Sequence, residues 1–230
     1  MLQKSLNDPN LLWIADRIGG CDLKNGPWIA GGVARRLWFD EPWKDADVDV
    51  FFPNIESFDY AKDCLKKRIV PENTNKILKP LLDFGSIVVD VLTCSSLDSR
   101  RKPDAVSVYE SKNAITYKIR INKSHQNTCN VQIIRRDWHD SLTSVWKNFD
   151  LTACMFATDG KIVVADQQAV LDCKNKILRK NQQTTRNVKL SRVVKYSIYG
   201  FDAGADVMSD LLQQYKDGTI SEVEGSEDYA

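Results

Sequence analysis

Residues 47–52 read Asp-Val-Asp-Val-Phe-Phe, and their first four side chains alternate strictly between charged and apolar. Alternation with a period of two is typical of a β-strand that buries one face. Side chains two positions apart in a strand share a face, so Asp47 and Asp49 are expected side by side. Val48 and Val50 point the other way, into the core. The segment therefore predicts a sheet with one apolar face and one face that carries two neighbouring carboxylates.

The same patterns divide the rest of the chain into strands and helices. Strands are predicted at 27–30, 47–52, 86–93, 115–122, 129–135, 150–157 and 161–165. Helices are predicted at 7–18, 33–38, 56–69, 137–147, 166–180, 189–199 and 203–216. Several strands follow one another without a helix between them. This favours an α+β fold, with a mixed sheet flanked by helices, over a repeated βαβ chain.

Strand signals fade after about residue 166, and helical patterns take over. We therefore expect an α+β domain over residues 1–165, followed by a small helical C-terminal part over 166–216. Residues 217–230 are mostly polar and acidic at their end, and we expect a flexible tail there.

Composition excludes several classes of protein. Hydrophobic residues make up 43% of the chain and charged residues 27%, which are values of a folded protein rather than a disordered one. The net charge is +1, so any binding of nucleic acid must come from a local basic patch. Apolar runs fall short of the roughly 20 residues that a spanning helix needs, and the polar N-terminus has no secretion signal. We expect a cytoplasmic protein with no membrane partner.

Cysteine and histidine usage argues against two further kinds of site. The six cysteines are scattered without a Cys-x-x-Cys pair, and the only histidines are His125 and His139. This spacing fits neither a zinc site nor a disulfide-rich secreted scaffold. We expect buried, reduced thiols and no chemistry that depends on histidine.

Asp47 and Asp49 are the first candidates for a metal site. Two carboxylates this close repel each other, and a bound divalent cation removes that cost. Ligands that are all oxygen favour Mg²⁺ or Mn²⁺. The alternative interpretation is the polar outer face of an amphipathic strand, because an Asp-x-Asp pattern alone is common.

Gly31 and Gly32 lie between a predicted strand and a predicted helix. Glycines in such a turn allow close approach of the backbone to a ligand, and a helix N-terminus presents N–H groups to phosphate. Arg35 and Arg36 follow in the first turns of the helix, where they could add charge-assisted contacts. A plain strand-to-helix turn is the alternative. A glycine turn that precedes an Asp-x-Asp strand is more specific than either feature alone.

Two segments resemble motifs of the DNA polymerase β-like nucleotidyltransferase superfamily. They are Ala30-Gly31-Gly32-Val33-Ala34-Arg35 and Asp47-Val48-Asp49-Val50-Phe51. The first is similar to the Gly-Gly-x-x-Arg element of tRNA nucleotidyltransferases and poly(A) polymerases. The second is similar to that family's Asp-h-Asp strand, where h is apolar. Later segments, at 131–134, 148–151, 192–196 and 200–201, resemble nucleotidyltransferase-like proteins of phages and large viruses.

The resemblance implies that residues 1–165 form a catalytic domain that binds a nucleoside triphosphate (NTP) with two divalent cations, Mg²⁺ or Mn²⁺. Asp47 and Asp49 would hold the metals, and the glycine turn would hold the triphosphate. The family places a third carboxylate on a neighbouring strand. Asp150 matches the viral Phe-Asp pattern and is the first candidate, with Asp90 as the alternative. A helix cap or a strand-end aspartate is the other interpretation of both.

Residues 174–195 carry eight basic side chains and no acidic one. Within this stretch and just after it, Arg192, Lys195 and Tyr196 lie at i, i+3 and i+4 of a predicted helix, so they share one face. That face could hold a triphosphate and stack a base, and the whole stretch could contact an RNA or a protein acceptor. A solvated helix face is the alternative interpretation.

These features predict an enzyme that transfers a nucleoside monophosphate from an NTP to an acceptor hydroxyl. The acceptor would be an RNA 3′ end, a protein or a small molecule. The alternative is a protein of the same fold with weak or lost catalysis that binds a nucleotide or a partner protein.

Overall fold

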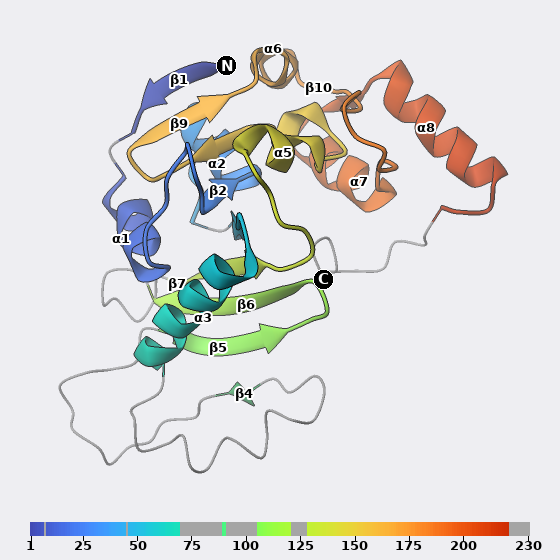
Figure 1. The fold of residues 1–230 in the computed structure, drawn as a ribbon. Coiled ribbons are helices and arrows are strands. Elements are labelled where there is room, and N and C mark those ends of the chain that lie inside the picture. Colours follow the sequence, from blue (N-terminus) through green and yellow to red (C-terminus); the bar gives the residue numbers. More distant parts are fainter. Residues whose placement is uncertain (7, 45, 70–88, 91–104, 121–127, 221–230) are drawn as a thin grey trace.

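The computed structural model describes residues 1–6, 8–44, 46–69, 89–90, 105–120 and 128–220. Within these ranges a nine-stranded sheet has the order β1-β9-β8-β2-β3-β7-β6-β5-β4 (Figure 1). Its strands are β1 Leu2–Ser5, β2 Trp28–Ala30, β3 Val48–Phe51, β4 Val89–Asp90, β5 Ala105–Glu110, β6 Ala114–Arg120, β7 Thr128–Ile134, β8 Phe156–Thr158 and β9 Ile162–Ala165. The pair β3/β7 is parallel and its neighbours in the sheet are antiparallel, which confirms the predicted mixed sheet.

The remaining elements are helices and one small second sheet. The helices are α1 Pro9–Arg17, α2 Gly32–Trp38, α3 Ile55–Ile69, α5 Leu142–Lys147, the 3-10 helix η2 Thr152–Cys154, α6 Gln167–Lys174, α7 Leu190–Ile198 and α8 Ala205–Lys216. The short strands β10 (Ile177–Leu178) and β11 (Asp202–Ala203) pair in parallel. Every helix in the described ranges is too short or too polar to cross a lipid bilayer.

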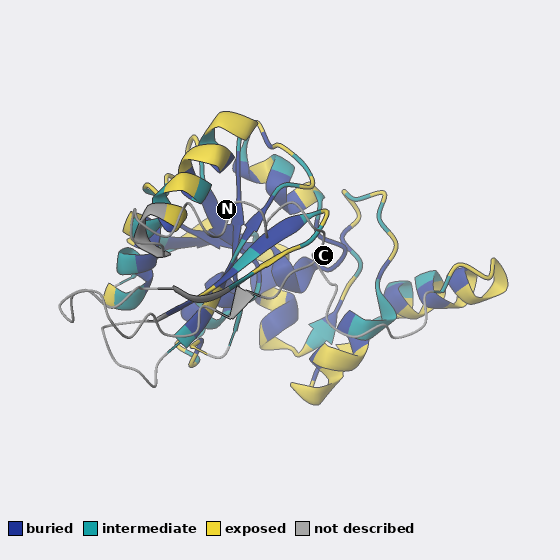
Figure 2. Ribbon diagram, turned by 90° about the horizontal axis from the view of Figure 1, so that it is seen from below, coloured by how far each residue is buried: buried dark blue, intermediate teal, exposed yellow. Residues whose placement is uncertain are grey.

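Two hydrophobic clusters hold these elements together. One lies between the sheet and helices α1 and α3, and it contains the fully buried Val48, Val50 and Val131. The other joins β2, β8 and β9 to helices α5 to α8. Figure 2 shows the helices with buried inner faces and exposed outer faces, as expected for amphipathic helices packed on a sheet.

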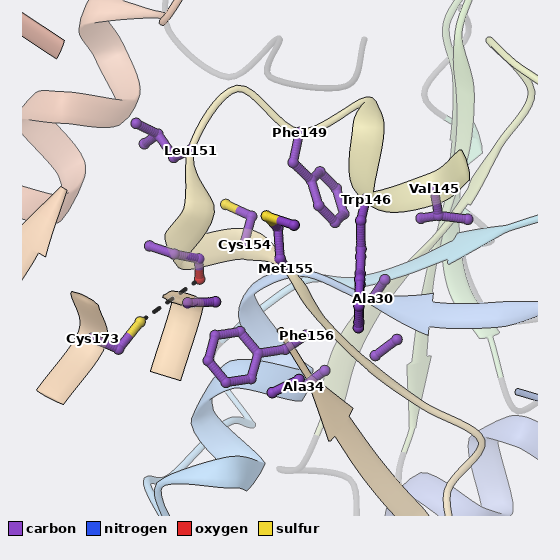
Figure 3. Packing of buried hydrophobic residues seen from close by; sticks show 14 of the residues in the cluster. Ala30, Ala34, Val145, Trp146, Phe149, Leu151, Cys154, Met155, Phe156 and Cys173 are labelled. Atoms are coloured by element: carbon purple, nitrogen blue, oxygen red, sulfur yellow. Dashed lines mark hydrogen bonds between the residues drawn. The ribbon is translucent and has the colours of Figure 1, made fainter. Parts of the chain in front are cut away.

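The second cluster crosses the predicted boundary at residue 166. Figure 3 shows Trp146, Phe149, Met155 and Phe156 packed around Ala30 and Ala34. The same cluster contains buried residues of α6, α7 and α8. The division into 1–165, 166–216 and a tail stays a prediction, and the first two parts share one apolar core.

Three predicted elements differ from the structure. The helix predicted at 137–147 begins only at Leu142, because the backbone N–H of His139 donates to Phe52 O (3.0 Å) and Ser141 caps the helix. The helix predicted at 166–180 ends at Lys174, and Lys176 follows with φ 55°.

The third difference is the strand predicted at 150–157, which begins only at Phe156. Ahead of it the chain pairs with residues 179–181 instead of with the large sheet. The Thr152 N–H donates to Arg179 O (3.0 Å), and the Asn181 N–H donates to Asp150 O (2.8 Å). Strands β1 and β5 were not predicted, and most of the strand predicted at 86–93 lies outside the described residues.

His139 makes the stability of this fold depend on pH. Its ring is buried and packs edge-on against Phe51, with ring centroids 5.8 Å apart. Burial lowers the pKa of His139; Asp137 opposes this effect and Arg186 adds to it. The unfolded chain therefore takes up a proton at His139 before the folded chain does as the pH falls. The stability that depends on a neutral His139 is therefore present above a pH of about 6.5 and is lost progressively below it.

We expect the melting temperature to decrease as the pH is lowered from 7.5 to 5.5. The decrease should be smaller in His139→Gln than in the wild type. Differential scanning fluorimetry across this range measures both slopes. Equal slopes for the wild type and His139→Gln would contradict the assignment.

Candidate nucleotide site

One row of side chains crosses the sheet at the position of Asp49. The strand register places Asp49 opposite Ala30 of β2 on one side and opposite Gln132 of β7 on the other. Gln132 is paired in turn with Thr116 of β6, and Thr116 with Tyr109 of β5. Directly paired residues share a face of the sheet. The row therefore brings polar groups from four strands to the face that carries Asp49.

Gly31 connects this row to helix α2. It adopts φ 88°, a left-handed conformation that side chains rarely tolerate, and its N–H donates to Phe156 O (2.9 Å). A Cβ atom at Gly31 would lie 3.6 Å from Asp49 Oδ2. The glycine thus turns the chain from β2 into α2 directly beside the buried carboxylate.

A cavity of about 360 Å³ opens over the row. This volume suits a small ligand. Its lining residues come from α2, β3, the three strands β5 to β7, α7 and the segments between them: Gly32, Arg35, Arg36, Ala46, Asp47, Asp49, Tyr109, Ser111, Ala114, Thr116, Asn130, Gln132, Cys154, Arg192, Lys195, Tyr196 and Tyr199.

Four basic side chains line the cavity from the helical side. Arg35 and Arg36 come from α2, and Arg192 and Lys195 from α7. Arg35 is only 4% exposed, and its Nε is buried with no hydrogen-bond partner among the described residues. Its Nη1 lies 3.3 Å from Glu41 Oε2. A buried guanidinium that is incompletely paired favours an anionic ligand, because an unsatisfied charged donor is costly.

Asp47 and Asp49 line the cavity together, Asp49 buried and Asp47 half-buried. Asn130 of β7 donates from Nδ2 to Asp47 Oδ1 (2.9 Å). The oxygens of the two carboxylates are hard donors of the kind that binds Mg²⁺ or Mn²⁺. In the part of the chain that the structure describes, no three His, Cys, Asp or Glu side chains gather to hold a metal.

Asp150 is held away from this pair of carboxylates. Its Oδ1 accepts from Arg192 Nη1 (2.5 Å), and its Oδ2 accepts from the Lys189 N–H at the start of α7 (3.2 Å). Both side chains of the Asp150–Arg192 pair are at most 10% exposed. Asp150 therefore anchors α7 and Arg192, and it is absent from the cavity lining.

Asp90 lies on the edge strand β4, where its backbone is paired with Ser107 of β5; its side chain lies outside the described residues. Strands β5, β6 and β7 separate β4 from β3. At about 4.8 Å per strand, this places Asp90 about 19 Å from Asp49 along the sheet. Such a distance is too great for a shared metal ion.

Tyr196 and Cys154 are buried and also line the cavity. The Tyr196 ring is buried against Phe201, with centroids 5.2 Å apart, and its hydroxyl lies 3.4 Å from Cys154 Sγ. Burial raises the pKa of the Cys154 thiol and of the Tyr196 phenol. A protonated thiol is a poor nucleophile, so this cysteine is not suited to covalent catalysis.

The structure brings together eight of the residues singled out in the sequence: Gly32, Arg35, Arg36, Asp47, Asp49, Arg192, Lys195 and Tyr196. Gly31 is next to them, whereas Asp150 and Asp90 are elsewhere. The rest of the basic stretch does not form one wall. Three of its members make ion pairs instead: Arg179 with Asp172, Lys180 with Asp210 and Arg186 with Asp137.

Other lining residues escaped the sequence analysis. Asn130 and Gln132 alternate with apolar neighbours in β7 as Asp47 and Asp49 do in β3, and this alternation was the available signal. Tyr199 lies four residues after Lys195, on the same helical face, and its ring is 5.6 Å from the Arg36 guanidinium. The exposed Tyr199, rather than the buried Tyr196, is placed to stack on a planar ligand.

Comparison with known proteins gives the family of the chain. The model of a family described as Gabija anti-defense 2 (Gad2) family protein matches residues 6–176. The chain belongs to the Gad2 family. No curated protein matches this Gad2 family member.

Two solved structures of CCA-adding enzymes are similar to this chain. The CCA-adding enzyme of Thermotoga maritima, complexed with tRNA, matches with a TM-score of 0.50 and 13% identity over 95% of this chain and 47% of that one. The Bacillus stearothermophilus CCA-adding enzyme in complex with CTP matches with a TM-score of 0.47 and 12% identity, over 90% of this chain and 44% of that one. The chain thus spans about half the length of these enzymes. The first likeness shows a nucleotidyltransferase-like α+β fold.

Asp150→Asn tests whether this carboxylate anchors α7. The change removes one charge of a buried ion pair and keeps the shape of the side chain. We expect the free energy of unfolding, measured in urea, to fall by about 3–5 kcal/mol. Asp137→Asn is the matched control: its pair with Arg186 is more exposed and should contribute less than about 1 kcal/mol. Unchanged or raised stability in Asp150→Asn would contradict this anchoring role.

Proposed function

We propose that this protein is a nucleotidyltransferase that transfers a nucleoside monophosphate from an NTP to an acceptor hydroxyl. The observation that supports this most directly is the arrangement of charge in one cavity. Asp47 and Asp49 lie on the sheet side, and four basic side chains lie on the helical side. A triphosphate carries about four negative charges and needs such a basic wall, and carboxylates opposite it suit a bridging cation.

The basic residues would bind the phosphates. Arg35 offers its buried Nε, and Arg36 and Lys195 lie at the more exposed rim. Gly32 lines the cavity without a side chain, so a phosphate oxygen could approach the backbone there. Tyr199 could stack on the base. Together these contacts would orient the α-phosphorus toward the carboxylates.

Asp47 and Asp49 fit a divalent cation, because they supply hard oxygen ligands and the triphosphate supplies more. When bound, Mg²⁺ or Mn²⁺ would offset charge on the phosphates and lower the barrier to phosphoryl transfer. The acceptor hydroxyl would attack the α-phosphorus as the bond to the β-phosphate oxygen breaks and pyrophosphate leaves. An aspartate carboxylate beside the hydroxyl would accept its proton. Positioning and electrostatics account for most of such catalysis.

Membership of the Gad2 family suggests that this activity counters the Gabija defence, consistent with a phage protein acting in the host cytoplasm. The acceptor would then be an RNA, a protein or a small molecule of the host. The structure lends little support to RNA binding along residues 174–195, since three of its basic side chains are already ion-paired.

A second candidate function is a nucleotide-binding module with weak or lost catalysis. Its support is the small number of carboxylates: among the described lining residues only Asp47 and Asp49 carry one. Such a protein would bind an NTP tightly and act through a partner.

Asp49→Asn separates the two functions. It removes one charge at the metal position and keeps the shape of the side chain. If the protein is an enzyme, transfer from a labelled NTP to RNA or protein, with Mn²⁺ present, should fall by at least about 10³-fold. Asp63→Asn, the same change on the exposed side of α3, is the control and should leave transfer unchanged. A wild type that transfers nothing to any acceptor would favour the binding module.

Lys195→Gln tests the basic wall. Lys195 is exposed at the rim of the cavity, so the fold should be kept, while one charge-assisted contact to phosphate is lost. We expect the NTP dissociation constant to rise about tenfold and to depend less on salt, as measured by fluorescence titration with a labelled analogue. Lys174→Gln, an exposed lysine of the same basic stretch outside the cavity lining, should change neither quantity. An equal effect of both changes would point to general surface charge.

A further inference from the structure

The neighbours of Asp49 in the sheet are not carboxylates. Strand β3 is flanked by β2 and β7. The residues directly paired with Asp49 are Ala30 on β2 and Gln132 on β7. Gln132 lines the cavity beside Asp49, at the distance of adjacent strands, about 4.8 Å between backbones. The position on a neighbouring strand that could share a cation with Asp49 therefore carries a neutral amide.

The carboxylate of Asp47 also has an amide as its neighbour. An amide N–H of Asn130 donates to its Oδ1 at 2.9 Å. A hydrogen-bond donor directed at this oxygen competes with a cation for the same lone pairs. The carboxylate has fewer oxygen sites for metal than a carboxylate exposed to solvent.

Among the described residues, the other acidic groups are not within reach of Asp49. Asp150 is paired with Arg192, Glu41 lies against Arg35, and Asp90 is at the far edge of the sheet. In the described ranges, no three His, Cys, Asp or Glu side chains lie close enough together to hold a metal ion.

Charge balance decides how many ions this donor set can hold. The paired ions of a two-metal site lie about 3.5–4 Å apart and bring four positive charges. Their mutual repulsion is about four times that of two unit charges at the same distance. Among the described lining residues only Asp47 and Asp49 supply carboxylates against this repulsion. Four lining side chains are basic, and two of them, Arg35 and Arg192, are already paired with acidic groups. The NTP would have to offset the remaining positive charge of the two ions by itself.

We infer that the cavity holds one divalent cation with each bound NTP, and that Gln132 is the residue that keeps a second ion from binding. This inference rests on the proposed nucleotide site. One cation, with the basic wall, is enough to bind and orient an NTP. The hydroxyl that attacks would lack the second cation, and its activation would fall to the aspartate carboxylates.

The experiment counts bound Mn²⁺ by electron paramagnetic resonance, in the presence of a saturating non-hydrolysable NTP analogue. We expect one Mn²⁺ per chain for the wild type. Gln132→Glu is nearly the same shape and adds a carboxylate beside Asp49. It should bind two ions per chain, or bind a second one at least tenfold more tightly than the wild type. Thr116→Glu is the matched control, because it adds the same charge one strand farther from Asp49, and it should still bind one.

Two Mn²⁺ per wild-type chain would overturn the inference, whatever the variants do. So would a second ion gained equally by Gln132→Glu and Thr116→Glu, or a Gln132→Glu protein that folds by circular dichroism and still binds one. A wild type that binds neither the analogue nor Mn²⁺ would sink the proposed function itself. Analogue binding with two ions would leave that function standing and reject only the single-ion site.

Discussion

The parallel pairing of β3 with β7 is the constraint from which the cavity follows. Parallel neighbours cannot be joined by a tight turn. Between β3 and β7 the chain passes through α3 and the strands β4 to β6. The register is fixed because Val48 and Val50 meet Val131 and Ile133 in the core. A slip of one residue on either strand would turn its valines outward and its polar side chains inward. The place of Asp49 is therefore a result of apolar packing on the opposite face.

The face that carries Asp49 is itself divided. At one end Phe51 packs on Phe149, with ring centroids 5.6 Å apart, and α5 covers it. Two residues earlier in the same strand, Asp49 lines the cavity. On one face of the short strand β3, Phe51 therefore packs in the core and Asp49 lines the cavity. Truncating Phe149 would act on both, since the aromatic contact lies next to the carboxylate position.

Local pattern was enough to predict β3, the glycine turn and helix α7, because alternation and helical spacing are properties of neighbouring residues. It was not enough for Asp150, whose surroundings are set by pairing with residues about 30 positions later. The partner of Arg186 is Asp137, which no local pattern connects with it. Gln132 alternates with apolar neighbours, which predicts its face of the sheet, but an uncharged side chain does not by itself indicate a ligand site. Its importance comes only from its position beside Asp49.

The Asp150–Arg192 pair has a consequence for ligand binding. A long arginine side chain usually loses much rotational freedom when it contacts a ligand, and this loss weakens binding. Here the guanidinium is held by a carboxylate that also accepts from the N–H of Lys189, the residue before α7. The Arg192 side chain is therefore already ordered before a ligand enters the cavity. The contribution of Arg192 to ligand affinity thus depends on a buried residue, Asp150, as well as on the residues that line the cavity.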